Sequence, residues 1–153
     1  MKDQYFGDIN DYRKYGLLRC FVEGGFALGV CWMLTPNGTS NDGQKTRYLQ
    51  QPSQWRGFDP ELFDFLSSCV MNSARAVRHL EDSALLSNTR YCSDLLGDDA
   101  ASRAILIRSA LRSLSPSDLL FFDPDNGLEV KSAAYGSRGS SKYIYWDEVQ
   151  QAW

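Results

Sequence analysis

The stretch Asp118-Leu-Leu-Phe-Phe-Asp-Pro-Asp-Asn-Gly-Leu-Glu129 decides the predicted fold. Its apolar run over 119–122 stops abruptly at the turn residues 123–127, Asp-Pro-Asp-Asn-Gly. A short apolar run bounded by turn residues is typical of a buried strand in a parallel sheet. Pro124 has no N–H to donate, so it cannot continue a central strand. Carboxylates therefore follow the carboxyl end of a predicted central strand, which is where open α/β sheets bind their ligands.

A second apolar run, 27–34 (ALGVCWML), also has the length of a strand. It ends at a long polar turn, 35–43, which contains two glycines. Cap residues and the helical spacing of apolar side chains predict helices that start near Asp8, Asp59 and Ala100. Strands that alternate with helices indicate an α/β fold with a parallel, Rossmann-like sheet flanked by helices.

Several weaker segments complete the predicted chain. Residues 76–80 fit either a short strand that ends at Glu81 or the continuation of a helix. Residues 89–92 fit another strand, which ends near Asp94. The Gly- and Ser-rich segment 132–141 predicts a mobile loop, and 143–153 begins a last element. That element would normally lead to a further strand, so we expect either a natural short form or a fragment of a longer chain.

The composition predicts one domain over residues 1–153. The chain is 43% hydrophobic and 23% charged, which is ordinary for a globular domain. No apolar run approaches the ~20 residues needed to cross a bilayer. The N-terminal sequence lacks the apolar region of a signal peptide. Four widely spaced cysteines, with no Cys-x-x-Cys pair, predict reduced thiols in a cytoplasmic protein without a membrane partner.

The charge pattern gives little direct evidence for a partner. A net charge of −3 provides no overall attraction to nucleic acid or to an anionic membrane. Five arginines of the middle and later chain are interpreted as solvated helix faces rather than as a basic patch: Arg75, Arg78, Arg103, Arg108 and Arg112. The single histidine, His79, excludes a site with several histidine ligands, and we interpret it as a packed residue. The oligomeric state is not predicted.

The layout resembles that of class I methyltransferases, which use S-adenosylmethionine (SAM). In that family the first strand ends in a Gly-rich turn beside the cofactor, and the fourth ends in Asp-Pro-Pro-Tyr or a variant. More narrowly, the chain resembles the group of the J-type 23S rRNA adenine-N6 methyltransferase and the three-Cys-motif partner proteins. Gly7-Asp-Ile-Asn-Asp-Tyr-Arg-Lys14 and a helical insertion at 44–73, after the first strand, carry this likeness. The resemblance spans residues 7 to about 150, with 118–127 as its most specific motif.

The resemblance implies a SAM site at the ends of the predicted strands. In this sequence Glu81 matches the acid that holds the ribose, and Asp94 matches the acid near the adenine. The implied cofactor-binding residues are Thr35, Asn37, Gly38, Glu81 and Asp94. They should converge with Asp123 on one cleft, with less than roughly 15 Å between Gly38 and Asp123.

The resemblance also implies the chemistry. The implied catalytic residues are Asp123, Pro124, Asp125 and Asn126. Asp123 and the Pro124 carbonyl would accept hydrogen bonds from an exocyclic amine of a nucleic-acid base, and positioning would supply most of the rate. Asp125-Asn126 stand where the family has Pro-Tyr, so Trp146 or Tyr143 is the candidate for the stacking ring. The implied function is methyl transfer from SAM to a base amine.

Two other interpretations stay open at this stage. Asp123, Asp125 and Glu129 supply the hard oxygen ligands that Mg²⁺ prefers, which would suit a metal-dependent nuclease or phosphohydrolase. The Pro-Asp…Glu-x-Lys order over 124–131 also echoes a nuclease pattern. The third interpretation is a catalytically degenerate methyltransferase-like fold that only binds a partner.

Overall fold

The computed structural model describes residues 1–39 and 43–152, which fall into two compact units. We call the first the sheet unit, and it comprises 1–2, 26–36 and 88–152. We call the second the helical unit, and it comprises 3–25, 37–39 and 43–87. The single domain expected over 1–153 remains a prediction, and each unit is described by itself.

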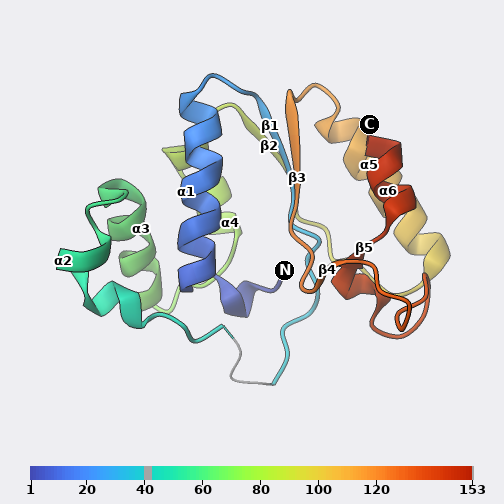
Figure 1. Cartoon of the computed structure of the whole chain (residues 1–153), viewed down its shortest axis with the longest axis horizontal. Coiled ribbons are helices and arrows are strands. Elements are labelled where there is room, and N and C mark those ends of the chain that lie inside the picture. Colours follow the sequence, from blue (N-terminus) through green and yellow to red (C-terminus); the bar gives the residue numbers. More distant parts are fainter. Residues whose placement is uncertain (40–42, 153) are drawn as a thin grey trace. The chain divides into compact units, whose positions relative to one another are not determined.

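The sheet unit is built on three parallel strands. They are β1 (Leu28–Cys31), β2 (Thr89–Cys92) and β3 (Leu119–Phe122), in the order β2-β1-β3 (Figure 1). Leu28 is in register with Thr89 on one side and with Leu119 on the other. The structure thus confirms an α/β protein with a parallel sheet, whereas the full Rossmann-like arrangement remains a proposal.

The position of β3 corrects one expectation. We predicted that 119–122 forms a central strand, but β3 lies at an edge, because it pairs with β1 alone among the described residues. All four residues of β3 are half-buried, whereas all four of β1 are buried. After Phe122 the chain turns into a separate two-residue strand, β4 (Gly127–Leu128). An apolar run therefore identified a strand but not its place in the sheet.

Gly29 explains how closely β1 packs against its neighbours. A Cβ at Gly29 would lie 2.5 Å from Cδ2 of Leu120 and 3.0 Å from Cβ of Leu114. Since a side chain does not fit there, glycine lets β1 approach β3 and the end of helix α5 (Ala100–Leu114). The core of this unit includes Cys31, Met33, Cys92, Leu96, Ile107, Ala110, Leu114 and Ile144.

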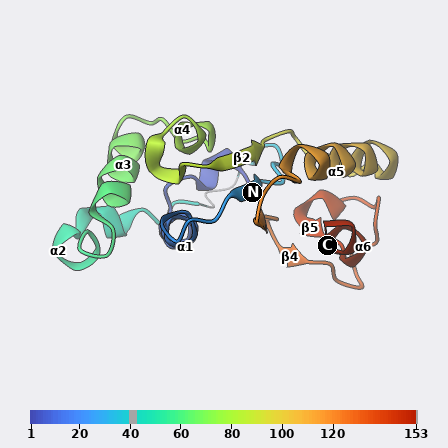
Figure 2. The same cartoon turned by 90° about the horizontal axis from the view of Figure 1, so that it is seen from above.

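The rest of the sheet unit packs beside α5. That helix begins at its N-cap Asp99, whose carboxylate accepts the Ser102 N–H. The segment 127–152 forms β4, the 3₁₀ helix η4 (Ser140–Lys142), β5 (Tyr143–Ile144) and α6 (Trp146–Ala152). β4 and β5 pair in parallel as a second small sheet, and Figure 2 shows this group beside α5.

The helical unit confirms the predicted helix starts. Asp8 caps α1 (Ile9–Glu23), and Asp59 caps α3 (Pro60–Met71), with Pro60 at the first helical position. The predicted insertion at 44–73 is helical, because it contains η2 (Arg47–Gln50), α2 (Pro52–Trp55) and α3. The remaining elements are η1 (Asp3–Tyr5), α4 (Arg78–Glu81) and η3 (Ala84–Leu86).

The segment 76–80 takes the helical alternative. Its residues from 78 onward belong to α4, so Glu81 ends a short helix and does not follow a strand. Leu80 is fully buried. The short helix buries it without the hydrogen bonds to a neighbouring strand that a β-strand would need. Among the residues that the structure describes, no helix combines the length and the apolar character needed to cross a membrane.

Candidate functional site

The carboxyl edge of the sheet brings part of the predicted site together. The Asp123 N–H donates to the Cys31 carbonyl at 3.0 Å, which continues the pairing of β3 with β1 past the end of the strand. Thr35 and Asp125 meet at the same edge, where the Thr35 hydroxyl donates to Asp125 Oδ2 at 3.0 Å. These residues are buried or nearly so, and the first turn after β1 therefore contacts the Asp-Pro-Asp segment.

The α-ammonium of Met1 occupies this edge. It donates to the Met33 carbonyl at 3.1 Å and to the Asp123 carbonyl at 2.9 Å. It also forms an ion pair with Asp125 Oδ1 at 2.8 Å. Met1 is only 2% exposed, so its charge is held by three oxygen atoms away from bulk water.

The main chain of Thr35 binds the carbonyl end of Met1. The Thr35 N–H donates to the Met1 carbonyl at 2.9 Å. Met33 has a φ of 47°, in the left-handed region that costs energy for a residue other than glycine, and its carbonyl is one of the three ammonium acceptors. We call Met33, Thr35, Asp123 and Asp125 the ammonium cradle. It binds an ammonium and the neighbouring carbonyl, which together are the main-chain end of an α-amino acid.

Asp94 follows a strand, β2, as predicted, whereas Glu81 does not. Because β2 pairs directly with β1, Asp94 follows the strand next to the centre of the sheet. Its Oδ2 lies 3.9 Å from the Cys92 sulfur. Glu81 is in α4 of the helical unit, so the assignment of Glu81 to the end of a strand is wrong.

The remaining predicted cofactor residues belong to the helical unit. There the Gln4 N–H donates to Asn37 Oδ1 at 3.1 Å, and the Gly38 N–H donates to Gln4 Oε1 at 2.6 Å. Asn37 and Gly38 thus bind the segment around η1. Their convergence with Asp123 remains a prediction.

The proposed metal ligands are engaged elsewhere. Asp125 binds the Met1 ammonium, and Glu129 Oε1 accepts the Trp146 N–H at 3.1 Å. Within 1–39 and 43–152, no three His, Cys, Asp or Glu side chains gather in a way that suits a metal ion. Asn126 donates its N–H to the Lys142 carbonyl at 2.8 Å, which joins the predicted catalytic segment to the β5 side. The Trp146 side chain is 53% exposed, as a stacking ring requires.

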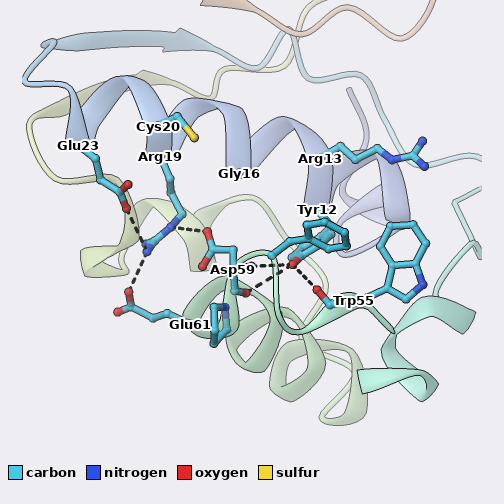
Figure 3. Close-up of a pocket in the computed structure, with 11 residues that line it drawn as sticks. Tyr12, Arg13, Gly16, Arg19, Cys20, Glu23, Trp55, Asp59 and Glu61 are labelled. Atoms are coloured by element: carbon cyan, nitrogen blue, oxygen red, sulfur yellow. Dashed lines mark hydrogen bonds and ion pairs between the residues drawn. The ribbon is translucent and has the colours of Figure 1, made fainter. Parts of the chain in front are cut away.

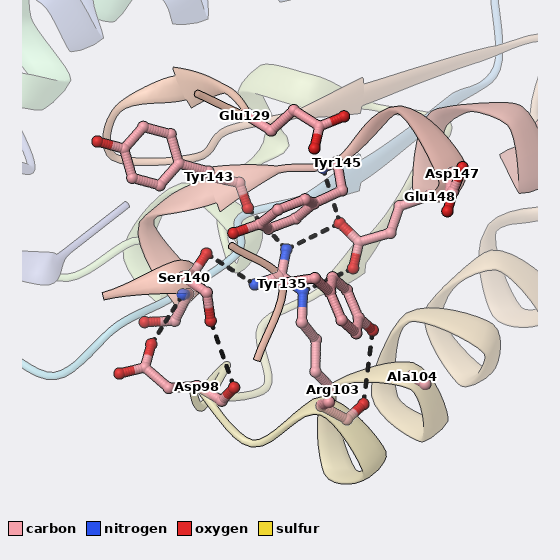
Figure 4. Close-up of polar contacts among 12 residues, drawn as sticks. Asp98, Arg103, Ala104, Glu129, Tyr135, Ser140, Tyr143, Tyr145, Asp147 and Glu148 are labelled. Carbon is pink, nitrogen blue, oxygen red and sulfur yellow. Dashed lines mark hydrogen bonds and ion pairs between the residues drawn. The ribbon is translucent and has the colours of Figure 1, made fainter. Parts of the chain in front are cut away.

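A buried arginine that we interpreted as a solvated residue organises the C-terminal part of the sheet unit (Figure 4). Arg103 is 0% exposed and makes a bidentate pair with Glu148, with Nε–Oε1 and Nη2–Oε2 distances of 2.6 and 2.8 Å. It also donates to the carbonyls of Ser140, at 3.0 Å, and Tyr143, at 2.6 Å. The Tyr145 ring centroid lies 5.0 Å from its guanidinium carbon. Sequence spacing gave no signal for this cluster, because its members lie up to 45 residues apart.

The predicted mobile loop 132–141 is tied down at its end. The Asp98 carboxylate accepts the N–H groups of Gly139 and Ser141, both at 2.8 Å. These two backbone hydrogen bonds hold the pKa of Asp98 below its usual value. Together with Arg103, Asp98 fixes η4 and the start of β5.

Two thiols face each other at the end of the first two strands. Cys31 and Cys92 are in register on β1 and β2, and both are buried free cysteines. A hydrogen bond from Cys31 lowers the pKa of Cys92 to about 7, although burial acts in the opposite direction. The same hydrogen bond and burial raise the pKa of Cys31. A pair of this kind behaves as one titrating unit.

The helical unit contains a separate hollow of about 750 Å³, between α1 and the segment that joins α2 to α3 (Figure 3). Trp55, Phe58 and Pro60 line one side, and polar residues of α1 line the other. No binding site between these residues was predicted from the sequence. The feature of the sequence that could have indicated the hollow is the aromatic pair Trp55 and Phe58. Composition alone does not distinguish exposed aromatic residues from residues of the core.

Comparison with known protein families, with curated proteins and with solved structures found no match to this chain. The resemblance to methyltransferases therefore remains an expectation from the motif and the layout.

Proposed function

We propose that this protein is a methyltransferase-like protein that binds SAM at the carboxyl edge of its sheet and transfers the methyl group to an amine of a nucleic-acid base. The observation that carries the proposal is the ammonium cradle beside the Asp-Pro-Asp-Asn segment. It lies at the carboxyl ends of parallel strands, where ligands of open α/β sheets bind.

The chemistry of the cradle matches the amino-acid end of SAM. That end carries an ammonium and a carboxylate on one carbon. Three oxygen acceptors, from Met33, Asp123 and Asp125, match the three protons of an ammonium. The Thr35 N–H, which now binds the Met1 carbonyl, is the donor for the carboxylate. Asp94, after the neighbouring strand, is the candidate acceptor for ribose hydroxyl groups.

The methyl acceptor would lie on the other side of Asp123. Its carboxylate and the Pro124 carbonyl are the candidate acceptors for the base amine, which they would orient toward the methyl group. Positioning of this kind supplies rate without strong base chemistry. Trp146 remains the candidate for the stacking ring, since a base can stack only on an accessible aromatic face.

Met1 has to leave the cradle before SAM can bind there. The cofactor and the Met1 main chain would use the same donors and acceptors, so they compete for them. The apparent affinity for SAM is then the intrinsic affinity reduced by the fraction of molecules with an empty cradle. We expect the affinity to be modest and to rise when Met1 is displaced.

A methyl-transfer assay tests the proposal. The purified chain is incubated with radiolabelled SAM and with total RNA, DNA or protein, with and without EDTA. We expect EDTA-resistant transfer to nucleic acid, loss of transfer in Asp123→Ala, and partial retention in Asp123→Asn, because an amide oxygen still accepts a hydrogen bond. Asp147→Asn, an exposed change in the same unit, is the matched control and should leave transfer unchanged. EDTA-sensitive cleavage without transfer would instead support the metal-dependent nuclease.

A binding-only protein is the second candidate. The observation that favours it is the occupied cradle, because a segment of the chain itself satisfies the groups that a cofactor needs. This candidate predicts neither transfer nor cleavage for the wild-type chain, and no methyl transfer after Met1 is displaced by an N-terminal extension.

A further inference from the structure

The hollow in the helical unit has a rigid frame. The Tyr12 hydroxyl donates to the Trp55 carbonyl at 2.9 Å and accepts the Asp59 N–H at 3.1 Å, which fixes the 55–59 segment against α1 (Figure 3). Gly16 forms part of the α1 side, and a Cβ there would meet only Leu62 Cδ2, at 3.9 Å. The absence of a side chain at Gly16 leaves the middle of the hollow open.

The hollow is elongated. It is lined from Arg13 to Glu23 along α1, and ten residues of a helix span about 15 Å. That length matches roughly five residues of extended peptide at about 3.3 Å each. The volume of about 750 Å³ lies within the usual range of ligand sites. An extended peptide therefore fits its shape better than a compact molecule does.

Aromatic side chains supply the apolar contact surface. Phe58 is 79% exposed, and its ring centroid lies 6.2 Å from that of the half-buried Trp55. Covering an exposed side chain of this size is favourable, because it removes apolar surface from water. The pair can therefore anchor an apolar side chain of a partner.

The far end of the hollow is acidic. Arg19 is paired with Asp59 at 2.7 Å, with Glu61 at 2.9 Å and with Glu23 at 3.6 Å (Figure 3). Burial alone would lower the pKa of Arg19, but hydrogen bonds and charges of Glu61 and Asp59 together raise it. One guanidinium thus faces three carboxylates, which leaves two negative charges uncompensated. The side chains of Glu23 and Glu61 are 68% and 69% exposed, so both can meet a ligand.

The other end carries the opposite charge. The Arg13 guanidinium carbon lies 5.9 Å from the centroid of the Trp55 ring, and Arg13 is exposed. Figure 3 shows Arg13 and Trp55 on the side away from Glu23 and Glu61. The charges therefore define a direction along the hollow. A chain of phosphates does not match this pattern, because it would run into the acidic end.

We propose that this hollow binds a short extended peptide of a partner protein, with an aromatic or large aliphatic side chain against Trp55 and Phe58 and a basic side chain against Glu23 and Glu61. The assignment rests on the complementarity of charge and on the length of the hollow, and it is independent of the methyltransferase proposal. The partner is specified by this pattern of an apolar residue and a lysine or arginine within about five residues.

Peptide selection on the full chain tests the proposal. Displayed random 12-residue peptides are selected on the wild-type protein and counter-selected on Phe58→Ala, which removes peptides that bind elsewhere. We expect an enriched pattern of one apolar residue and one basic residue. Fluorescence anisotropy of a selected peptide should show about tenfold weaker binding, or worse, for Phe58→Ala. Glu23→Gln/Glu61→Gln should bind less tightly at low salt and lose most of the salt dependence.

Matched variants and a thiol reporter guard against indirect effects. Leu17→Ala removes an exposed apolar side chain of α1 that does not line the hollow, and Asp82→Asn removes an exposed acid of the same unit. Both should bind the peptide as the wild type does. Cys20 lines the hollow and is exposed, so bound peptide should slow its alkylation severalfold.

Three results would overturn the proposal. The first is a selection with no enrichment over the Phe58→Ala protein. The second is an enriched pattern that lacks a basic residue. The third is saturable binding of single-stranded oligonucleotides that Phe58→Ala abolishes, which would assign the hollow to nucleic acid. Thermal unfolding of each variant shows whether loss of binding accompanies loss of fold.

Discussion

Removing the charge of Glu148 should destabilise the sheet unit strongly. Glu148 is 2% exposed and is the bidentate partner of the fully buried Arg103. Glu148→Gln keeps the size of the side chain but leaves the guanidinium without a counter-charge and without one acceptor. Breaking a buried pair by changing one partner costs about 3–5 kcal/mol. The carbonyls of Ser140 and Tyr143 still accept from Arg103, so we expect a value near the lower end, about 3 kcal/mol.

Urea unfolding followed by far-UV circular dichroism measures this change. A slope of about 2 kcal/mol per molar urea converts 3 kcal/mol into a midpoint shift of about 1.5 M. Asp147→Asn, an exposed change on the same helix, is the matched control and should stay within about 0.5 kcal/mol of wild type. Arg103→Met/Glu148→Leu should be less destabilised than Glu148→Gln, because it buries no lone charge. A Glu148→Gln midpoint equal to that of the control would refute the argument.

Three further changes test other parts of the structure. Asp125→Ala removes the counter-charge of the buried Met1 ammonium, so we expect the free energy of unfolding in urea to fall by about 3 kcal/mol. An unfolding midpoint equal to that of wild type would contradict this. The folded-state pKa of Asp98 is lowered, so its contribution is complete above the unfolded value of about 3.9 and is lost as the pH falls through the folded value. Acid titration of Asp98→Asn should therefore show a flatter loss of stability below about pH 4 than wild type, and parallel curves would contradict this. Gly29→Ala places a Cβ against Leu120 and should cost about 1–3 kcal/mol by thermal or urea unfolding, whereas an unchanged midpoint would mean that β3 shifts freely.

The local signals in the sequence predicted local structure well. Asp8 and Asp59 were identified as helix starts because a side-chain acceptor before an apolar pattern satisfies the first free N–H groups. The runs that became β1 and β3 were identified because they are apolar and end at turn residues. The rule for parallel sheets placed Thr35 and the segment that begins at Asp123 at the same edge, and the Thr35 hydroxyl does donate to Asp125.

The missed features depend on distant partners. The run 119–122 is apolar although β3 lies at an edge of the described sheet, because Leu120 and Phe122 pack against the core of the sheet unit. An apolar run does not reveal how many neighbours its strand has. Arg103 looked solvated because the residue that neutralises it, Glu148, follows only after three further strands, β3, β4 and β5. The role of the Met1 ammonium depends on carbonyl groups, which every residue has and no sequence pattern marks. Glu81 was assigned to the end of a strand by resemblance, but the chain forms the short helix α4 there.

Binding of S-adenosylhomocysteine, compared with adenosine, tests the central claim most directly. Adenosine lacks the amino-acid end that the ammonium cradle is proposed to hold, so the two ligands differ at the groups in question. Isothermal titration should give one site, with S-adenosylhomocysteine bound at least about tenfold more tightly, as charge-assisted hydrogen bonds of about 1.5–3 kcal/mol imply. Amide chemical shifts should change at Thr35 and Asp125. Equal affinities, no saturable binding at millimolar ligand, or shifts confined to the helical unit would contradict the proposed cofactor site.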